Sequence, residues 1–414
     1  MSGEASAATT DAASRTRVAA SFLFFALLLA AYYLLRPVRD ALAAGLGSGA
    51  IKYLSTAVLV SSGVVAAFYG WLVARLPRRR LVPILYAAFA LQAAGFAALF
   101  MLLPGSRWLA QAFYVWLAVF NLVMVASFWS FMADLWQAQG TRHFARIAAG
   151  GSAGGMLGPL LARHYATSWG TAGLTAAAAV LLGLCALLAI GLMVGTDATR
   201  RLRFNEPVGG SAFAGLRLVA ESPYLRAIAL LVAAGSFIGM FVYIEVAHAA
   251  AALFPDTTQR TAYFASRDLW VNGLSLAIQW FLAPPLMRRW GVGVALVVVA
   301  GVVGTLFSAL LIWPSAALLL AINVMTRTLE FGVGKPCRDV LYTAVDTEST
   351  YKAKNVIDTV FYRACDTTAG WLHALLTGLG AGLPVLGGLA VLMAGGMASV
   401  GVGLGQRFKA QARV

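Results

Sequence analysis

Long apolar runs are the feature of this sequence that most restricts its fold. A helix needs about 20 mostly apolar residues to cross the hydrocarbon core of a bilayer, and the chain offers twelve such windows. Hydrophobic residues make up 60% of the 414 residues and charged residues 11%, too little polar surface to cover a water-exposed globule. The predicted spans are 18–44, 52–74, 81–103, 108–131, 145–168, 171–194, 226–253, 264–286, 292–312, 315–334, 355–379 and 383–405. The sequence therefore predicts an all-α integral membrane protein.

Basic residues between the spans predict the topology. Placing both termini in the cytoplasm puts most of the 31 Lys and Arg on that side, including the clusters at 75–80 and 200–203. This bias follows the positive-inside rule. The net charge of +15 is thus explained without a nucleic-acid partner. We expect cytoplasmic tails at 1–17 and 406–414, an uncleaved first span, and a protein whose partner is the lipid bilayer and which can act as a monomer.

One long hydrophilic connection, 196–225, divides the chain into segments 18–195 and 226–405. Asp134 follows the fourth span and Asp339 follows the tenth, and each precedes a basic stretch and another helix. Their offset is close to half the chain. We expect two pseudo-symmetric six-helix bundles, the major facilitator-like architecture, in which substrate binds between the halves near the midplane of the membrane.

The first span carries Arg36, Arg39 and Asp40 at positions i, i+3 and i+4, so the three side chains share one helix face. Pro37 lacks a backbone donor and permits a bend there. Guanidinium groups match the geometry of phosphate and carboxylate, which predicts a contact with an anion. The alternative is that the two arginines snorkel at the outer end of the helix.

Ionisable residues also occur in the spans of the second half, where a charge at the bilayer centre costs about 2.5 to 3.5 kcal/mol or more. Glu245 lies one turn from His248 in the seventh span, and we expect it to be protonated or to pair with an arginine of the first span. Arg327 and Glu330, at i and i+3 in the tenth span, can instead neutralise each other. The other candidate site residues, in the charged passage 335–366, are Lys335, Arg338, Asp358 and Asp366. The alternative for this passage is a cytoplasmic loop whose charges anchor two helix ends.

Motifs for enzymes, metals and cofactors are lacking. No Ser-His-Asp order, zinc spacing or Walker pattern occurs, and the three cysteines are expected to be free thiols. The glycine-rich segment 150–159 lies in a membrane span, where glycines at every fourth position favour a groove for a neighbouring helix over a phosphate loop. We therefore expect no catalytic residues, metal or cofactor.

Three motifs resemble the non-mitochondrial ATP:ADP antiporter family, nucleotide transporters of plastids and intracellular bacteria that are related to the major facilitators. The first span matches at Leu35, Arg36, Arg39 and Asp40, the seventh at Glu245, and the charged passage at Pro336–Asp339 and Tyr351–Asp358. The resemblance implies roles in nucleotide exchange for Arg39, Glu245 and Arg338. The segment after Asp134 departs from the family because it lacks further acids, and Arg39 and Arg338 stand where the family commonly has lysine.

Together these features predict a secondary transporter of a bacterial cytoplasmic membrane, working by alternating access on an anionic, phosphate-bearing metabolite. ATP/ADP or other nucleotide exchange is one candidate. The alternatives are transport of a non-nucleotide organic anion or another small solute, a membrane sensor or scaffold that transports nothing, and an aqueous channel.

Overall fold

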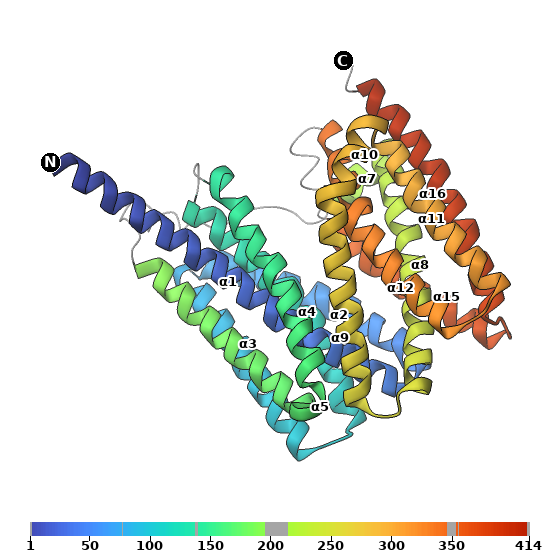
Figure 1. Ribbon diagram of the computed structural model, residues 1–414, viewed down its shortest axis with the longest axis horizontal. Helices are drawn as coiled ribbons and strands as arrows, with labels where there is room; N and C mark the ends of the chain where they lie inside the picture. Colours follow the sequence, from blue (N-terminus) through green and yellow to red (C-terminus); the bar gives the residue numbers. More distant parts are fainter. Residues whose placement is uncertain are drawn as a thin grey trace. The chain divides into compact units, whose positions relative to one another are not determined.

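The computed structural model describes residues 2–76, 78–136, 140–194, 214–345, 353–354 and 356–411, and these are almost entirely helical (Figure 1). The first part of the chain forms α1 (Ser2–Leu46), α2 (Ser48–Arg75), α3 (Arg78–Leu102), α4 (Arg107–Trp136) and α5 (Gly140–Val194). The second part forms α7 (Ala214–Glu221), α8 (Pro223–Leu253), α9 (Thr257–Ala277), α10 (Ala283–Trp290), α11 (Val292–Ile312), α12 (Ala316–Leu329), α13 (Lys335–Leu341), α15 (Tyr362–Gly378) and α16 (Leu383–Gln411). Three π-helical segments, η2 (Ile278–Leu282), η3 (Glu330–Gly334) and η5 (Val356–Phe361), and one 3₁₀ turn, η4 (Tyr342–Ala344), lie between them.

The predicted spans fall on helical backbone, apart from a few terminal residues. Nine helices in the described part of the chain are long and apolar enough to cross a membrane. One of them, within α5, is long enough to contain two predicted spans. Gly170 lies between these two spans and interrupts the helix with φ of 61°, a conformation that glycine adopts at little cost. Spans 264–286 and 355–379 include η2 and η5, and neither is among the nine. The all-α membrane fold is confirmed.

The chain forms two compact units. Unit 1 contains Met1–Gly45, Ser61–Gly209 and Phe254–Leu269, and unit 2 contains Leu46–Val60, Gly210–Leu253 and Trp270–Val414. Compared with the halves predicted from sequence, Leu46–Val60 belongs to unit 2 and Phe254–Leu269 belongs to unit 1. The pseudo-symmetry of the two halves stays a prediction. Most of the predicted central loop lies outside the described residues, and its end forms α7.

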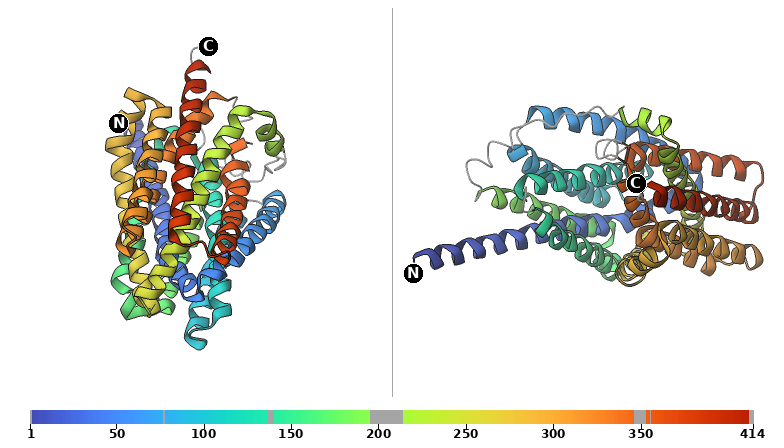
Figure 2. Two further views of the ribbon diagram at one scale, coloured as in Figure 1. Left: turned by 90° about the vertical axis from the view of Figure 1, so that its right-hand side faces the viewer. Right: turned by 90° about the horizontal axis from the view of Figure 1, so that it is seen from above.

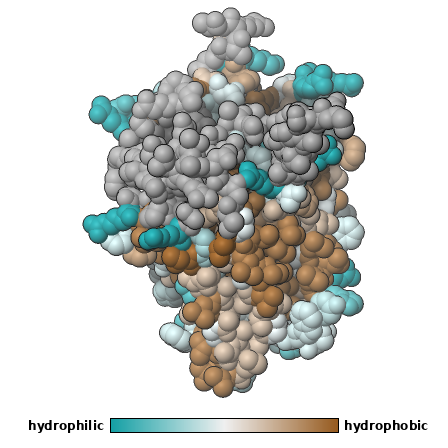
Figure 3. Space-filling model, turned by 90° about the vertical axis from the view of Figure 1, so that its left-hand side faces the viewer, coloured by the Kyte–Doolittle hydropathy of each residue, from teal (hydrophilic) through white to brown (hydrophobic). Residues whose placement is uncertain are grey.

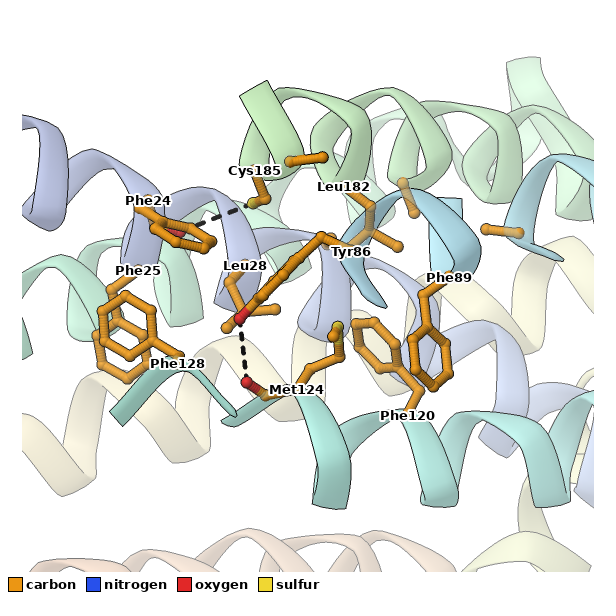
Figure 4. Packing of buried hydrophobic residues seen from close by; sticks show 14 of the residues in the cluster. Phe24, Phe25, Leu28, Tyr86, Phe89, Phe120, Met124, Phe128, Leu182 and Cys185 are labelled. Atoms are coloured by element: carbon orange, nitrogen blue, oxygen red, sulfur yellow. Dashed lines mark hydrogen bonds between the residues drawn. The ribbon is translucent and has the colours of Figure 1, made fainter. Parts of the chain in front are cut away.

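Aromatic side chains form the core of unit 1 (Figure 4). The rings of Phe25 and Phe128 stack with centroids 4.4 Å apart, and Phe24 contacts Phe128 edge-on at 5.2 Å. Tyr86 is fully buried, and its hydroxyl donates a hydrogen bond of 3.0 Å to the carbonyl oxygen of Met124. These contacts join α1, α3 and α4 and so fix the position of α1.

The predicted glycine groove is confirmed on α5. A Cβ built on Gly154 would lie 2.1 Å from the carbonyl oxygen of Ala26 on α1. Gly150 and Gly158 meet the α1 backbone in the same way, at 2.3 and 2.6 Å. Because no larger residue fits at this approach, the glycines let α1 and α5 pack at backbone contact.

In unit 2, α11 and α16 lie side by side, as the views in Figure 2 also show. A Cβ on Gly405 would lie 2.6 Å from the Cα of Gly293, so this pair also packs through glycine. Large apolar side chains remain on the surface, including Leu91 at 75% and Val64 at 64% exposure. Figure 3 shows a broad apolar area on one face of the molecule. Such a surface fits a protein that is surrounded by lipid.

Candidate functional site

Unit 1 contains a cluster of five charged side chains that are removed from solvent. Arg36, Arg39 and Asp40 come from α1, and Arg267 and Asp268 come from the middle of α9. Asp40 is 0% exposed, Asp268 1% and Arg267 2%. Buried ions are stable only when they are paired and hydrogen-bonded, so the stability of this cluster depends on the contacts between its members.

Each carboxylate of the cluster binds two guanidinium groups. Asp40 Oδ2 accepts a 2.6 Å hydrogen bond from Arg267 Nη2, and its Oδ1 accepts bonds of 2.7 and 3.0 Å from Arg39. Asp268 Oδ1 accepts two bonds from Arg267, at 2.8 and 3.0 Å, and its Oδ2 lies 3.6 Å from Arg36 Nε. The acids therefore hold three arginines together.

Aromatic rings orient the guanidinium groups. Arg39 lies over the ring of Tyr114 with 5.0 Å to the centroid, and Arg267 lies over Phe264 at 4.8 Å. These are favourable cation–π distances. Arg267 Nη1 is buried and has no hydrogen-bond partner in the described part of the chain. The cluster therefore contains a donor that a bound anion can use.

A second set of charges lies in unit 2, around η3 and α13. Arg338 Nη2 donates a 2.6 Å hydrogen bond to Glu330 Oε1, and Lys354 Nζ donates one of 2.6 Å to Asp339 Oδ1. Arg338, Lys354 and Lys335 lie close enough to Asp358 to act on its carboxyl group electrostatically, and Arg338 has the largest effect of the three. In the part of the charged passage that the structure describes, Arg338 and Lys354 thus each pair with an acidic side chain.

Asp366 of α15 belongs to a separate group in unit 2. Arg363, Arg327 and Tyr362 lie near enough to its carboxyl group to act on it electrostatically. This places the predicted residues Arg327 and Asp366 together. Lys335 instead lines a groove of about 570 Å³ with Gln279 and Phe331.

Glu245 of α8 pairs with His373 of α15. The distance between Glu245 Oε1 and His373 Nε2 is 2.7 Å, and the two side chains are 20% and 7% exposed. The Phe241 ring and the imidazole are arranged edge-to-face, with centroids 5.7 Å apart. The carboxylate and the imidazole thus share one hydrogen bond inside the packing of α8 and α15.

Comparison with solved structures shows which proteins share this fold. A peptide transporter POT superimposes with a TM-score of 0.64 and 14% identity, over 94% of this chain and 95% of that one. A bacterial homologue of the iron transporter ferroportin gives 0.63 and 13%, over 94% and 98%. A D-xylose–proton symporter gives 0.61 and 14%, over 92% and 96%. The fold is therefore major facilitator-like. No family model and no curated protein sequence matches the chain.

Within this major facilitator-like fold, the structure adds partners to three predicted groups. Arg36 and Arg39 lie inside unit 1 rather than snorkelling at its surface, with side chains 8% and 13% exposed. Glu330 pairs with Arg338, because η3 and α13 bring these side chains together. Glu245 pairs with His373 of the same unit, and its pairing with an arginine of the first span stays a prediction.

Sequence analysis missed Arg267, Asp268 and His373. The first two are adjacent in a predicted span, and an Arg-Asp dipeptide inside a membrane window is the signal that could have identified them. His373 offered no comparable signal, since a single histidine in an apolar helix more often has a structural role. Tyr351, Lys352 and Asn355, from the motif that resembles the antiporter family, lie outside the described residues.

Proposed function

We propose that the protein is a secondary transporter that carries an anionic, phosphate-bearing solute by alternating access. The observation that carries this proposal is the arginine cluster of unit 1, with Arg36, Arg39 and Arg267 held by two carboxylates. Ionisable groups inside a membrane bundle are costly, and they commonly mark the path of a substrate or an ion. The shared fold with known transporters supports the same reading.

Guanidinium chemistry supports an anion as the substrate. Arginine forms two parallel hydrogen bonds with phosphate or carboxylate, and it stays charged when buried. Asp40 and Asp268 accept hydrogen bonds from these donors. An arriving anion would replace a carboxylate as the partner of an arginine, so neither charge would be left alone at a cost of several kcal/mol.

Exchange of substrate between the two sides requires that the anion bind the two states of the carrier differently. Competition between the anion and the carboxylates supplies such a difference, because it breaks ion pairs that join α1 to α9.

ATP/ADP exchange is one candidate for the transported substrate, supported by the motifs at Arg39, Glu245 and Arg338. A non-nucleotide organic anion uses the same donors and is the second candidate. We place the protein in the cytoplasmic membrane of a bacterium with both termini inside.

Binding to the purified protein in detergent tests this proposal. The probes are ATP, ADP, inorganic phosphate, a hexose phosphate and a dicarboxylate. Loss of a charged hydrogen-bonding group should weaken binding about tenfold to hundredfold in Arg36→Gln and Arg39→Gln. Arg289→Gln, at the end of α10, is the matched control and should bind like the wild type. Normal binding of these anions by a folded Arg39→Gln protein would exclude the cluster as the anion site.

A further inference from the structure

We propose that a groove on unit 2 binds the headgroup phosphate of an anionic phospholipid from the surrounding bilayer. The inference goes beyond the proposed function and does not depend on which solute is transported. The groove has a volume of about 570 Å³, and the residues that line it come from η2, α10, η3 and α13. All of them belong to unit 2, so the site is complete within this unit.

Two π-helical turns that pack against each other form the groove. In both η2 and η3, the first backbone N–H group after the turn donates to the carbonyl oxygen five residues earlier. Gln279 Nε2 donates a 2.9 Å hydrogen bond to the carbonyl oxygen of Phe331 and so joins the two turns. A Cβ built on Gly332 would lie 2.8 Å from Cγ2 of Ile278, which shows how closely they approach. Such turns within helices are rare and frequently occur at functional sites.

The lining of the groove combines apolar surface with a basic side chain. Ala283, Met287, Phe331 and Pro336 supply surface against which an acyl chain can pack. Lys335 is exposed, and its ammonium group forms no ion pair within the part of the chain that the structure describes. This amphipathic lining matches a ligand with a negative headgroup and an apolar tail.

The acidic groups near the groove have other partners. Asp339 also lines the groove, but its carboxylate accepts a 2.6 Å hydrogen bond from Lys354 Nζ. Lys335 acts electrostatically on Asp358, although Arg338 has a larger effect on that carboxylate. The positive charge of Lys335 is therefore available to a ligand.

Arg288 adds a second cation beside the groove. It directly follows Met287, which lines the groove, and its side chain is exposed in the last turn of α10. Ammonium and guanidinium groups both bind phosphate, the first as a point charge and the second through two parallel hydrogen bonds. Basic pockets between membrane helices on the cytoplasmic side are known to bind anionic lipid headgroups.

Large apolar side chains around the groove favour a lipid over a dissolved anion. Trp280 and Phe281 of η2 are 73% and 79% exposed, and Trp290 at the end of α10 is 61% exposed. Tryptophan is enriched where the hydrocarbon core meets the headgroups. In the proposed topology, the end of α10 and Lys335 both lie at the cytoplasmic leaflet, whose anionic lipids attract basic groups. A dissolved phosphate would gain nothing from the apolar surface.

Native mass spectrometry of the whole protein in detergent tests this inference. The probes are phosphatidylglycerol and phosphatidylcholine with identical acyl chains, and inorganic phosphate as a soluble anion. We expect the protein to bind phosphatidylglycerol more tightly than phosphatidylcholine. Lys335→Gln and Arg288→Gln should each weaken the binding of phosphatidylglycerol about fivefold, the effect of one basic residue near a membrane surface. Lys335→Arg keeps the charge and should keep the binding.

Arg226→Gln is the matched control. Arg226 is exposed on α8, lies on the same predicted side of the membrane and does not line the groove. This variant should bind phosphatidylglycerol like the wild type. Equal weakening in Arg226→Gln and Lys335→Gln would reveal only a general attraction between basic protein surface and anionic lipid, and would overturn the site.

Three further outcomes would overturn the inference. They are equal binding of the two lipids by the wild type, wild-type binding of phosphatidylglycerol by folded Lys335→Gln, and displacement of phosphatidylglycerol by inorganic phosphate that binds with the same dependence on Lys335. Thermal unfolding provides a second measurement, because a ligand that binds the folded state raises its stability. Phosphatidylglycerol should raise the melting temperature of the wild type more than that of Lys335→Gln. These results are independent of transport, so they leave the proposed function to its own test.

Discussion

Arg267 of α9 donates a 2.6 Å hydrogen bond to Asp40 of α1, although the two residues are 227 positions apart in the sequence. Both side chains are at most 1% exposed. A buried ion pair contributes little net stability compared with apolar residues, but removal of one partner leaves a buried charge with one counter-charge fewer. The pair therefore ties the end of α1 to the middle of α9 and makes each residue dependent on the other.

Asp40→Asn should destabilise the protein strongly. Breaking a buried pair by removing one partner typically costs about 3 to 5 kcal/mol, and Arg39 loses its ion pair with Asp40 as well. The double variant Asp40→Asn/Arg267→Gln should recover part of the loss, because it removes opposite charges together. Thermal unfolding of the purified proteins measures this, with Glu221→Gln on α7 as control. Purely additive effects of the two substitutions would contradict the coupling.

Gly154→Ala should weaken the packing of α1 on α5. The new methyl group would lie 2.1 Å from the carbonyl oxygen of Ala26, so the helices must separate. Overpacking of this kind costs about 1 to 3 kcal/mol. Gly191→Ala is the control on the same helix, since nothing lies within 4 Å of the added Cβ. Equal melting temperatures and yields for the two variants would show that the contact is not tight.

Asp256 should stabilise the beginning of α9 in a pH-dependent way. Its carboxylate accepts a hydrogen bond from the Thr258 hydroxyl and bonds of 3.1 and 3.3 Å from the backbone N–H groups of Thr258 and Gln259. The Thr258 hydroxyl is the main cause that lowers the pKa of Asp256 below its ordinary value of 3.8. Asp256→Ala should cost about 0.5 to 2 kcal/mol, as for other helix caps.

The sign of the pH effect follows from the lowered pKa. The contribution of Asp256 is complete above the pKa of the unfolded chain and is lost as the pH falls through the lower, folded value. The stability difference between wild type and Asp256→Ala should therefore be constant near neutral pH and shrink below about pH 4. A difference that grows on acidification would contradict the capping role.

The sequence predicted the first-span site and left its partners unknown, for a physical reason. Helical periodicity places Arg36, Arg39 and Asp40 on one face, and the structure brings these three together. Periodicity carries no information about which distant helix packs against that face, so Arg267 and Asp268 were missed. The same limit explains why His373 was missed as a partner of Glu245.

The spacing of the glycines predicted a contact between distant helices better than the spacing of the charged residues did. Small residues at every fourth position of α5 predict a close helix contact wherever they occur, and α1 fills that contact. The η3 segment could not be foreseen in this way. A π-helical turn depends on the insertion of one extra residue into a helical turn, and this turn precedes α13 and brings Glu330 to Arg338.

Counterflow in proteoliposomes tests the central claim most directly. Vesicles loaded with an unlabelled phosphate-bearing solute are diluted into a trace of the same labelled solute, with ATP, ADP and a hexose phosphate tried in turn and a dicarboxylate and a neutral sugar for comparison. We expect saturable uptake of a labelled phosphate-bearing solute that depends on the internal solute and is lost in Arg39→Gln. No counterflow of any anion by folded wild-type protein, or counterflow of the neutral sugar alone, would contradict the claim.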